Sequence, residues 1–272
     1  MKLTYFGTAA AEGFPAFFCN CEYCRVARKK RGKNIRSRSQ AMINDDLLID
    51  FPPDTYHHFA ENGVEGDLIK YILITHSHGD HLHAGDMIFR TGAYSHERRV
   101  PEVRLLCGKG AYNKITALGG AIKHITPELT ENYKKYSLGE YTVTSLPAKH
   151  YPGDDARFYI IEQDKTMLYA HDTGYFYDEV FDYFKENGIV FDLVSLDCTY
   201  VTLPVSDDSG HMGIENIRRA VKRLREIGAV TDKTTVVINH FSHNGNPDHE
   251  CLVEYVKDDG FVVSYDGLAV EF

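Results

Sequence analysis

Residues 71–81 read Tyr-Ile-Leu-Ile-Thr-His-Ser-His-Gly-Asp-His, an apolar run followed at once by four side chains that can bind metal. A short continuous apolar run of this kind is typical of a buried strand. The three imidazoles and one carboxylate lie within six residues, 76–81, and exceed what one tetrahedral ion takes from a single loop. The stretch therefore predicts two metal ions at the end of a buried strand.

Three further positions repeat this pattern of an apolar strand that ends in a metal-competent residue. His150 follows the run 143–149, Asp172 follows 167–171, and His240 follows 236–239. Each alone could be a polar strand end that meets water. Together with residues 76–81, they are expected to be ligands.

The spacing within the loop suggests how the ligands divide between two ions. His76 and His78 are two residues apart, so on an extended segment they project to the same side. Gly79 permits a tight turn that directs Asp80 and His81 toward a neighbouring ion. A carboxylate can bridge ions roughly 3.5–4 Å apart. We therefore predict a dinuclear site in which the first ion takes His76, His78 and His150, the second takes Asp80, His81 and His240, and Asp172 bridges them.

Strand patterns dominate the chain, and helical patterns fall between groups of strands. The strands are expected at 2–8, 39–44, 47–50, 71–75, 103–107, 141–146, 158–163, 166–170, 193–197, 235–239, 261–265 and 268–272. The helices are expected at 53–61, 84–94, 110–118, 177–186, 213–227 and 248–257. This order predicts an α/β (α+β) fold of two sheets packed face to face, with helices outside.

The sequence favours one domain over residues 1–272. It contains no Pro/Gly/Ser-rich linker, and the candidate ligands run from residue 19 to residue 243, so a boundary would split the site. Each half is expected to contribute strands and ligands. Residues 83–101 and 199–212 follow ligand-bearing strand ends and are the expected rims of the site.

Composition excludes some classes of function. The net charge of −9 argues against generic binding to a nucleic-acid backbone. No segment approaches the ~18 apolar residues of a membrane span. Residues 1–7 alternate like a strand and lack a leader pattern, so we expect no signal peptide and a cytoplasmic location.

One stretch departs from the acidic balance. Eight Lys or Arg residues lie between 25 and 38. They are either a solvated helix and loop or a positive rim that steers a phosphorylated substrate to the site.

The six cysteines divide into two groups. Cys19, Cys21 and Cys24 are packed into six residues, a spacing that favours a metal knuckle at 19–24 over disulfides. The isolated residues Cys107, Cys198 and Cys251 are expected to be reduced and buried.

With residues 75–81, His150, Asp172 and His240 in this order, nearly the whole chain resembles the metallo-β-lactamase superfamily in its H-x-H-x-D-H form. The resemblance implies a four-layer αβ/βα sandwich of two mixed β-sheets flanked by helices. It also implies a dinuclear hydrolytic site at one edge. The second histidine of the motif, His78, favours hydrolysis over the redox chemistry of diiron relatives.

A narrower resemblance involves residues 7–15, the cysteines at 19, 21 and 24, and residues 240–243. These look like the phosphodiesterase of the bacterial carbon–phosphorus lyase pathway. The resemblance implies a closed structural zinc site made by Cys19, Cys21, Cys24 and His243. It also places a catalytic histidine at His211, in the loop before the helix at 213–227; the alternative is a neighbour of the helix N-cap in a polar loop.

The function predicted from this pattern is an enzyme, a metal-dependent phosphodiesterase of small, possibly cyclic, sugar or nucleotide phosphate diesters. A hydroxide held between two divalent ions (Mn or Zn, or else Fe) attacks phosphorus. Asp80 orients the hydroxide, and His211 assists the leaving alkoxide. The expected partner is a small phosphorylated substrate, with no membrane and no nucleic acid; the oligomeric state, a homodimer included, is left open.

Three alternative functions are compatible with the same predicted metal ligands. They are a thioester, lactone or lactam hydrolase of the same superfamily, a nuclease like the tRNA-processing relatives, and a non-catalytic accessory protein like that of pyrroloquinoline quinone biosynthesis. The last shares the cysteine pattern, but its dinuclear ligand set is expected to be incomplete, whereas every position is filled here.

Overall fold

Two seven-stranded sheets pack face to face in the computed structural model, which describes residues 1–272. The first sheet has the order β14 (Ala269–Glu271), β1 (Lys2–Gly7), β2 (Gln40–Ile43), β3 (Leu47–Ile49), β4 (Tyr71–Ile74), β5 (Val103–Cys107), β6 (Ile125–Leu129). The second has the order β13 (Val262–Val263), β12 (Thr235–Asn239), β11 (Leu193–Asp197), β10 (Thr166–Ala170), β9 (Arg157–Glu162), β8 (Tyr141–Pro147), β7 (Lys135–Leu138).

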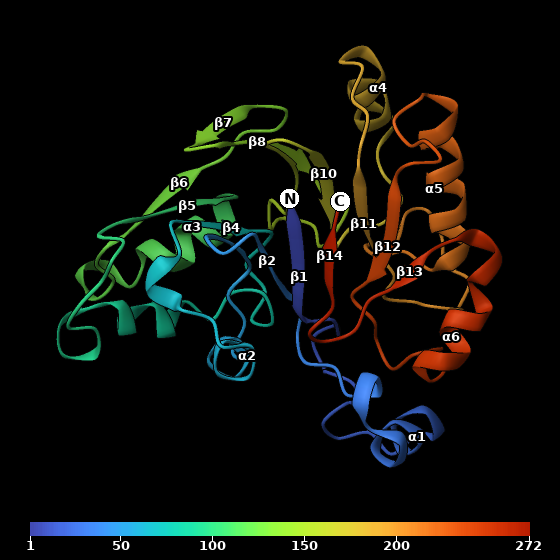
Figure 1. Ribbon diagram of the computed structural model, residues 1–272, viewed down its shortest axis with the longest axis horizontal. Coiled ribbons are helices and arrows are strands. Elements are labelled where there is room, and N and C mark those ends of the chain that lie inside the picture. The colour runs from blue at the N-terminus through green and yellow to red at the C-terminus, as the bar shows by residue number, and fades with distance from the viewer.

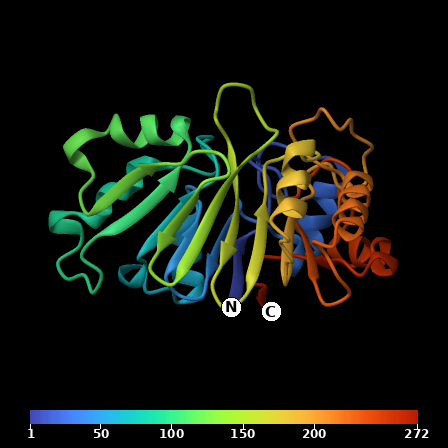
Figure 2. The same ribbon diagram turned by 90° about the horizontal axis from the view of Figure 1, so that it is seen from above.

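Helices cover the outer faces of both sheets (Figure 1). On the first sheet these are α2 (Thr55–Asn62) and α3 (Lys109–Thr116), and on the second α4 (Asp178–Glu186), α5 (Ile214–Glu226) and α6 (His249–Tyr255). Figure 2 shows α4 and α5, in gold and orange, on one side of the strands. The predicted sandwich of two sheets flanked by helices is confirmed.

The apolar residues form three main buried clusters, one between the sheets and one under each helical layer. Strand β9 is apolar at four consecutive positions, 158–161, because both of its faces are buried. Tyr159 and Ile161 pack between the sheets, whereas Phe158 and Ile160 pack under the helices. Because successive side chains on a strand point to opposite faces, a strand covered on both faces needs apolar residues throughout.

Parallel pairing brings the ends of distant strands to one edge of the sandwich. Strands β3 to β6 are parallel to one another, and so are β10 to β13. The loop that follows β4 carries residues 76–81, while Asp172 and His240 follow β10 and β12. The carboxyl ends of parallel strands lie at the same edge, so the sheet order assembles these side chains.

The expected strands are all present, but two further strands were not anticipated. Strands β6 and β7 bury only one residue each, and each is the last strand of its sheet. Helix α1 (Glu22–Lys30) begins directly after Cys21. Edge strands carry weak apolar periodicity, which explains why the patterns missed β6 and β7, whereas α1 overlaps the helix considered for the basic stretch 25–38.

Two predictions were wrong. An α-helix was expected over 84–94, but the chain forms two short 3₁₀ helices, η3 (Ala84–Arg90) and η4 (Gly92–Tyr94). Gly92 has φ 50°, a left-handed conformation that ends a right-handed helix. Cys251 was expected to be buried, but it lies on the exposed side of α6.

No helix combines the length and the apolar character that a membrane-spanning segment needs.

Candidate metal centre

Two groups of metal-competent side chains meet at the edge where β4, β10 and β12 end. In the first group, His76, His78 and His150 have ligand atoms within 4.8 Å of one another, and in the second the same holds for Asp80, His81 and His240. The Nε2 atom of His150 lies 3.2 Å from Nδ1 of His78. The Nε2 atoms of His81 and His240 are also 3.2 Å apart. The structure thus brings together all six residues in the two sets that the spacing suggested.

Asp172 lies between the two groups and directs one oxygen to each. Its Oδ1 atom is 4.0 Å from Nε2 of His76 and 3.9 Å from Nε2 of His150. Its Oδ2 atom is 3.0 Å from Nε2 of both His81 and His240. This is the arrangement expected of a bridging carboxylate.

Partners outside the centre fix the orientation of three imidazole rings. Asp50 accepts a hydrogen bond from Nδ1 of His81 at 2.7 Å. The carbonyl oxygen of Gly210 lies 3.2 Å from Nδ1 of His150, and Oγ1 of Thr199 lies 2.7 Å from Nδ1 of His240. Each partner occupies Nδ1 and leaves the Nε2 lone pair directed into the centre, which is how metal-binding histidines are commonly held.

The centre contains a buried polar atom that no protein group satisfies. Nε2 of His76 is buried and makes no hydrogen bond, whereas Oδ2 of Asp172 lies 3.0 Å from Nε2 of His81 and His240, which are candidate ligands themselves. Burial, followed by the charge of His81, holds the pKa of His76 well below its usual value, so this ring is a neutral ligand. Asp172 and His240 also have positive φ values, 54° and 66°, a costly backbone state that is common at functional sites. These features fit two divalent cations held by nitrogen and carboxylate donors.

His211 lies beside this centre and is held by Asp197. Nδ1 of His211 donates to Oδ2 of Asp197 at 2.9 Å, and its ring stacks on His240 with centroids 5.7 Å apart. Burial lowers the pKa of His211, but the charge of Asp197 outweighs it and raises the pKa to about 9. Asp197 is itself fixed by the backbone N–H groups of Asp172, Thr199 and Met212. Asp197 therefore fixes the orientation of the ring and favours its protonated form.

A cavity of about 770 Å³ opens in front of the centre. Four carboxylates line it, and its lining contains neither lysine nor arginine. Two of the carboxylates, Glu12 and Asp208, lie outside the two metal groups. Tyr151 also lines the cavity, with 67% of its surface exposed and its ring 5.8 Å from that of His78.

The expected rims are confirmed in one case and wrong in the other. Within the segment 199–212, Thr199, Asp208, Gly210 and His211 line the metal cavity. The segment 83–101 contributes nothing to it, because η3 and η4 pack on the outer face of the first sheet.

The three N-terminal cysteines meet His243 in a second group of ligands. The ligand atoms of Cys19, Cys21, Cys24 and His243 lie within 4.8 Å of one another. Nδ1 of His243 is 3.6 Å from Sγ of Cys21 and 3.7 Å from Sγ of Cys24. Burial opposes ionisation of the Cys21 thiol. Hydrogen bonds from His243, Cys24 and Cys19 nevertheless lower the pKa of this thiol to about 6. Three sulfurs and one imidazole fit a closed zinc site.

The basic stretch 25–38 does not line the metal cavity. Arg28 donates to the carbonyl oxygens of Ala16 and Cys19, so it holds the cysteine loop. Arg36 is buried and stacks on Phe241, and Arg38 pairs with Asp54. The prediction of a steering rim is therefore wrong for these three arginines, because each is bound by neighbouring groups and none lines the metal cavity.

Sequence reasoning did not assign roles to Asp50, Asp197 and Thr199. Asp50 and Asp197 each end an apolar strand pattern, which is the signal that had singled out Asp172. Applied to every strand end, that rule would have included both carboxylates. Thr199 has no such signal, since its role depends on how the loop after β11 folds over His240.

Comparison with known proteins places the chain in a family. The family model of the β-lactamase superfamily domain matches residues 47–241, so the chain belongs to this superfamily. Coenzyme PQQ synthesis protein B of Acinetobacter baylyi is 24% identical over 310 aligned positions, which cover 100% of both chains.

Two solved structures have the same fold. The crystal structure of a diphosphatase from the PhnP family has a TM-score of 0.76 at 19% identity, covering 100% of this chain and 96% of that one. Zinc-bound PqqB from Methylobacterium extorquens has a TM-score of 0.74 at 17% identity and covers 100% of both chains.

Proposed function

We propose that this protein is a metal-dependent hydrolase that cleaves small phosphate diesters, cyclic or linear, of sugars or nucleotides. The observation that carries the proposal is His211, held by Asp197 at 2.9 Å beside the two ligand groups and inside the same cavity. A protonated imidazole next to a dinuclear centre is suited to a reaction in which an alkoxide leaves.

Each residue has a role in this proposal. The two groups around Asp172 would hold two divalent ions, which when bound lower the pKa of water and offset charge on phosphate oxygens. Asp80 accepts a hydrogen bond from the attacking water and orients it. His211 uses Nδ1 to bind Asp197, so its Nε2–H is free to donate a proton to the leaving oxygen.

The charge of the cavity narrows the substrate class. A phosphate diester carries one negative charge, whereas a monoester carries up to two and RNA carries one for each nucleotide. Asp80 and Asp172 would be neutralised by the bound ions, so Glu12 and Asp208 are the lining carboxylates left to repel more highly charged substrates, and no lysine or arginine in the lining offsets them. This supports a small diester over a nucleic acid. A neutral thioester or lactone would also enter, so substrate tests must separate these classes.

The test compares model substrates on protein whose metal content has been measured. We expect turnover of bis(p-nitrophenyl) phosphate, with p-nitrophenyl phosphate, a thioester and a lactone reacting at least tenfold more slowly. The His211→Ala variant should lose about 10²–10⁴-fold in kcat with its metals retained, the usual contribution of an acid–base group. His83→Ala, an exposed histidine outside the cavity, is the matched control. Reaction with the carbonyl substrates alone would overturn the proposal.

A second candidate is a role in synthesis of coenzyme PQQ, favoured by the end-to-end similarity to the protein B relatives. Expression in a PQQ-producing bacterium that lacks its own protein B would test it. Restored coenzyme production by wild type favours this role. Diester turnover without restoration favours the phosphodiesterase.

A further inference from the structure

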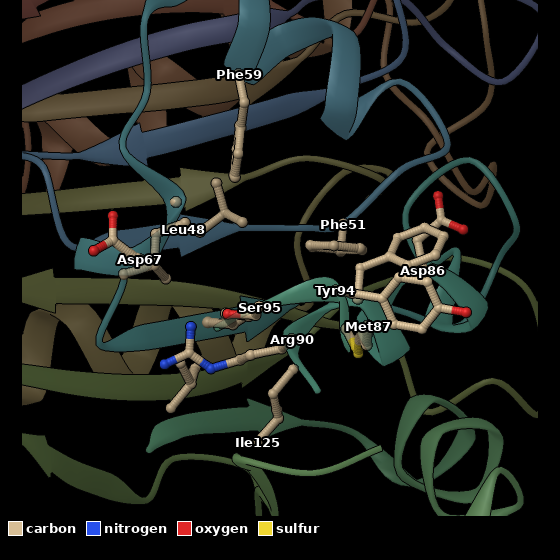
Figure 3. A pocket seen from close by; sticks show the side chains of 15 residues that line it. Leu48, Phe51, Phe59, Asp67, Asp86, Met87, Arg90, Tyr94, Ser95 and Ile125 are labelled. Carbon is tan, nitrogen blue, oxygen red and sulfur yellow. The ribbon is translucent and has the colours of Figure 1, made fainter. Parts of the chain in front are cut away.

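A second cavity, of about 250 Å³, lies on the outer face of the first sheet (Figure 3). It shares no lining residue with the metal cavity. Its floor consists of apolar side chains from four neighbouring strands: Leu48 of β3, Ile72 of β4, Val103 of β5 and Ile125 of β6. The 3₁₀ helices η3 and η4 cover this floor, so the segment 83–101 encloses a cavity of its own.

The cavity is open at an aromatic edge. Phe89 and Tyr94 both line it, yet 53% and 65% of their surfaces are exposed. Their rings pack edge to face with centroids 5.2 Å apart. Exposed apolar side chains scattered singly are ordinary, but two together at the mouth of an apolar cavity mark a place where a ligand can enter.

One guanidinium at this cavity has no carboxylate partner. Arg90 donates from Nε to the carbonyl oxygen of His124 at 3.1 Å and from Nη2 to that of Val100, and it forms no ion pair. Its neighbour Arg98 also lacks a carboxylate, and the buried Nε of Arg98 makes no hydrogen bond. A half-buried cation without a counter-ion is costly, so a ligand that supplies one is favoured.

The two carboxylates in the lining do not neutralise Arg90. Asp67 is bound by Arg99, whose Nε and Nη2 lie 2.6 and 2.7 Å from its two oxygens. Asp86 lies 3.4 Å from Nε2 of His83. Glu102 and Asp67 stabilise the charge of Arg90 from a distance, but no carboxylate forms an ion pair with it. Nη1 of Arg90 makes no hydrogen bond.

We propose that this cavity binds a small apolar carboxylic acid, with its hydrocarbon part against Leu48, Ile72 and Met87 and its carboxylate at Arg90. An apolar cavity of about 150 Å³ holds benzene, so 250 Å³ accommodates a ligand of about ten heavy atoms. A linear or aromatic acid of about eight carbons has this size. The site is independent of the metal centre and of the reaction catalysed there.

Octanoate is the probe, titrated into the metal-loaded protein while the methionine methyl groups are followed by NMR. Met87 lines the cavity, whereas Met212 lies beside His211 and Asp197 in the metal centre. We expect the Met87 signal to shift and saturate while Met212 stays unchanged. Octylammonium, of equal length and opposite charge, should bind at least tenfold more weakly. A shift of Met212 instead of Met87, or equal binding of the two probes, would overturn the proposal.

Two kinds of variant locate the ligand. Arg90→Gln should weaken octanoate binding by about 10–100-fold, the value of one charge-assisted hydrogen bond, and Arg90→Lys should retain more of it. Ser95→Phe adds bulk to the cavity lining and should abolish binding without removing a charge. If Arg90→Gln does not fold, Ser95→Phe decides the question: unchanged octanoate affinity in the folded variant contradicts the site.

Discussion

At the scale of single residues, the cysteine group offers the sharpest test. Cys21→Ser removes one of the sulfurs near His243, so we expect the protein to lose one bound zinc per chain. We also expect a loss of about 2 kcal/mol or more in the free energy of unfolding, a small part of the roughly 10 kcal/mol that zinc contributes to zinc-finger peptides. Metal analysis and urea denaturation measure the two effects.

Cys251→Ser is the matched control for this change. Its thiol is exposed on α6 and belongs to neither ligand group. Zinc content and stability should equal those of wild type. Equal zinc content in the Cys21→Ser variant would show that this group does not hold the metal.

At the scale of elements, helix α5 carries the packing on the outer face of the second sheet. Leu224 is fully buried there, and Leu224→Ala leaves a cavity that should cost about 2–5 kcal/mol. Lys222 lies on the exposed face of the same helix, 3.9 Å from Glu226, so Lys222→Ala should change stability by less than about 0.5 kcal/mol. Urea denaturation at one pH compares them. A Leu224→Ala variant as stable as Lys222→Ala would contradict this packing.

Apolar sequence patterns predicted the central strands well but failed at the edge strands β6 and β7 and in segment 84–94. The strands β4 and β10 to β12 are mostly apolar because both of their faces are covered, and these strands position the site. The edge strands β6 and β7 expose more side chains and lack this signal. Segment 84–94 has helical periodicity, but whether it forms an α-helix or 3₁₀ turns depends on its contacts with the sheet.

At the scale of the whole molecule, two buried histidines make stability depend on pH. Burial lowers the pKa of His58 to about 4, and nearby His57 adds to this while Asp54 opposes it. Burial, together with Arg36 and Lys33, lowers the pKa of His249 to about 4, although Glu250 and Asp248 oppose it. Both remain neutral in the folded protein, whereas the unfolded chain binds protons below pH ~6.5.

Stability should therefore be fully present above pH ~6.5 and fall as the pH drops toward 4. The loss is about 1.4 kcal/mol per pH unit for each histidine. Unfolding free energies at pH 7, 6 and 5 measure it, and the double variant His58→Gln/His249→Gln subtracts the effect of acid on the metal groups. Equal slopes for wild type and the double variant would contradict the assignment.

Residue types and local spacing were enough to predict the candidate metal ligands. A short local motif predicts the ligands His76, His78, Asp80 and His81 from residue type and spacing. The ends of buried strands predict the ligands His150, Asp172 and His240. The fold class was also predictable, because strands that are buried on both faces have predominantly apolar sequences.

Only the tertiary structure decided which groups support that chemistry. Asp50 holds His81, Asp197 holds His211, and Arg36 is buried against Phe241 because segments far apart in sequence meet there. The same holds for Arg90, whose lack of a counter-ion depends on Arg99 engaging Asp67. Hydrogen-bond partners and counter-ions are set by distances between remote segments, and those distances leave no periodic pattern along the chain.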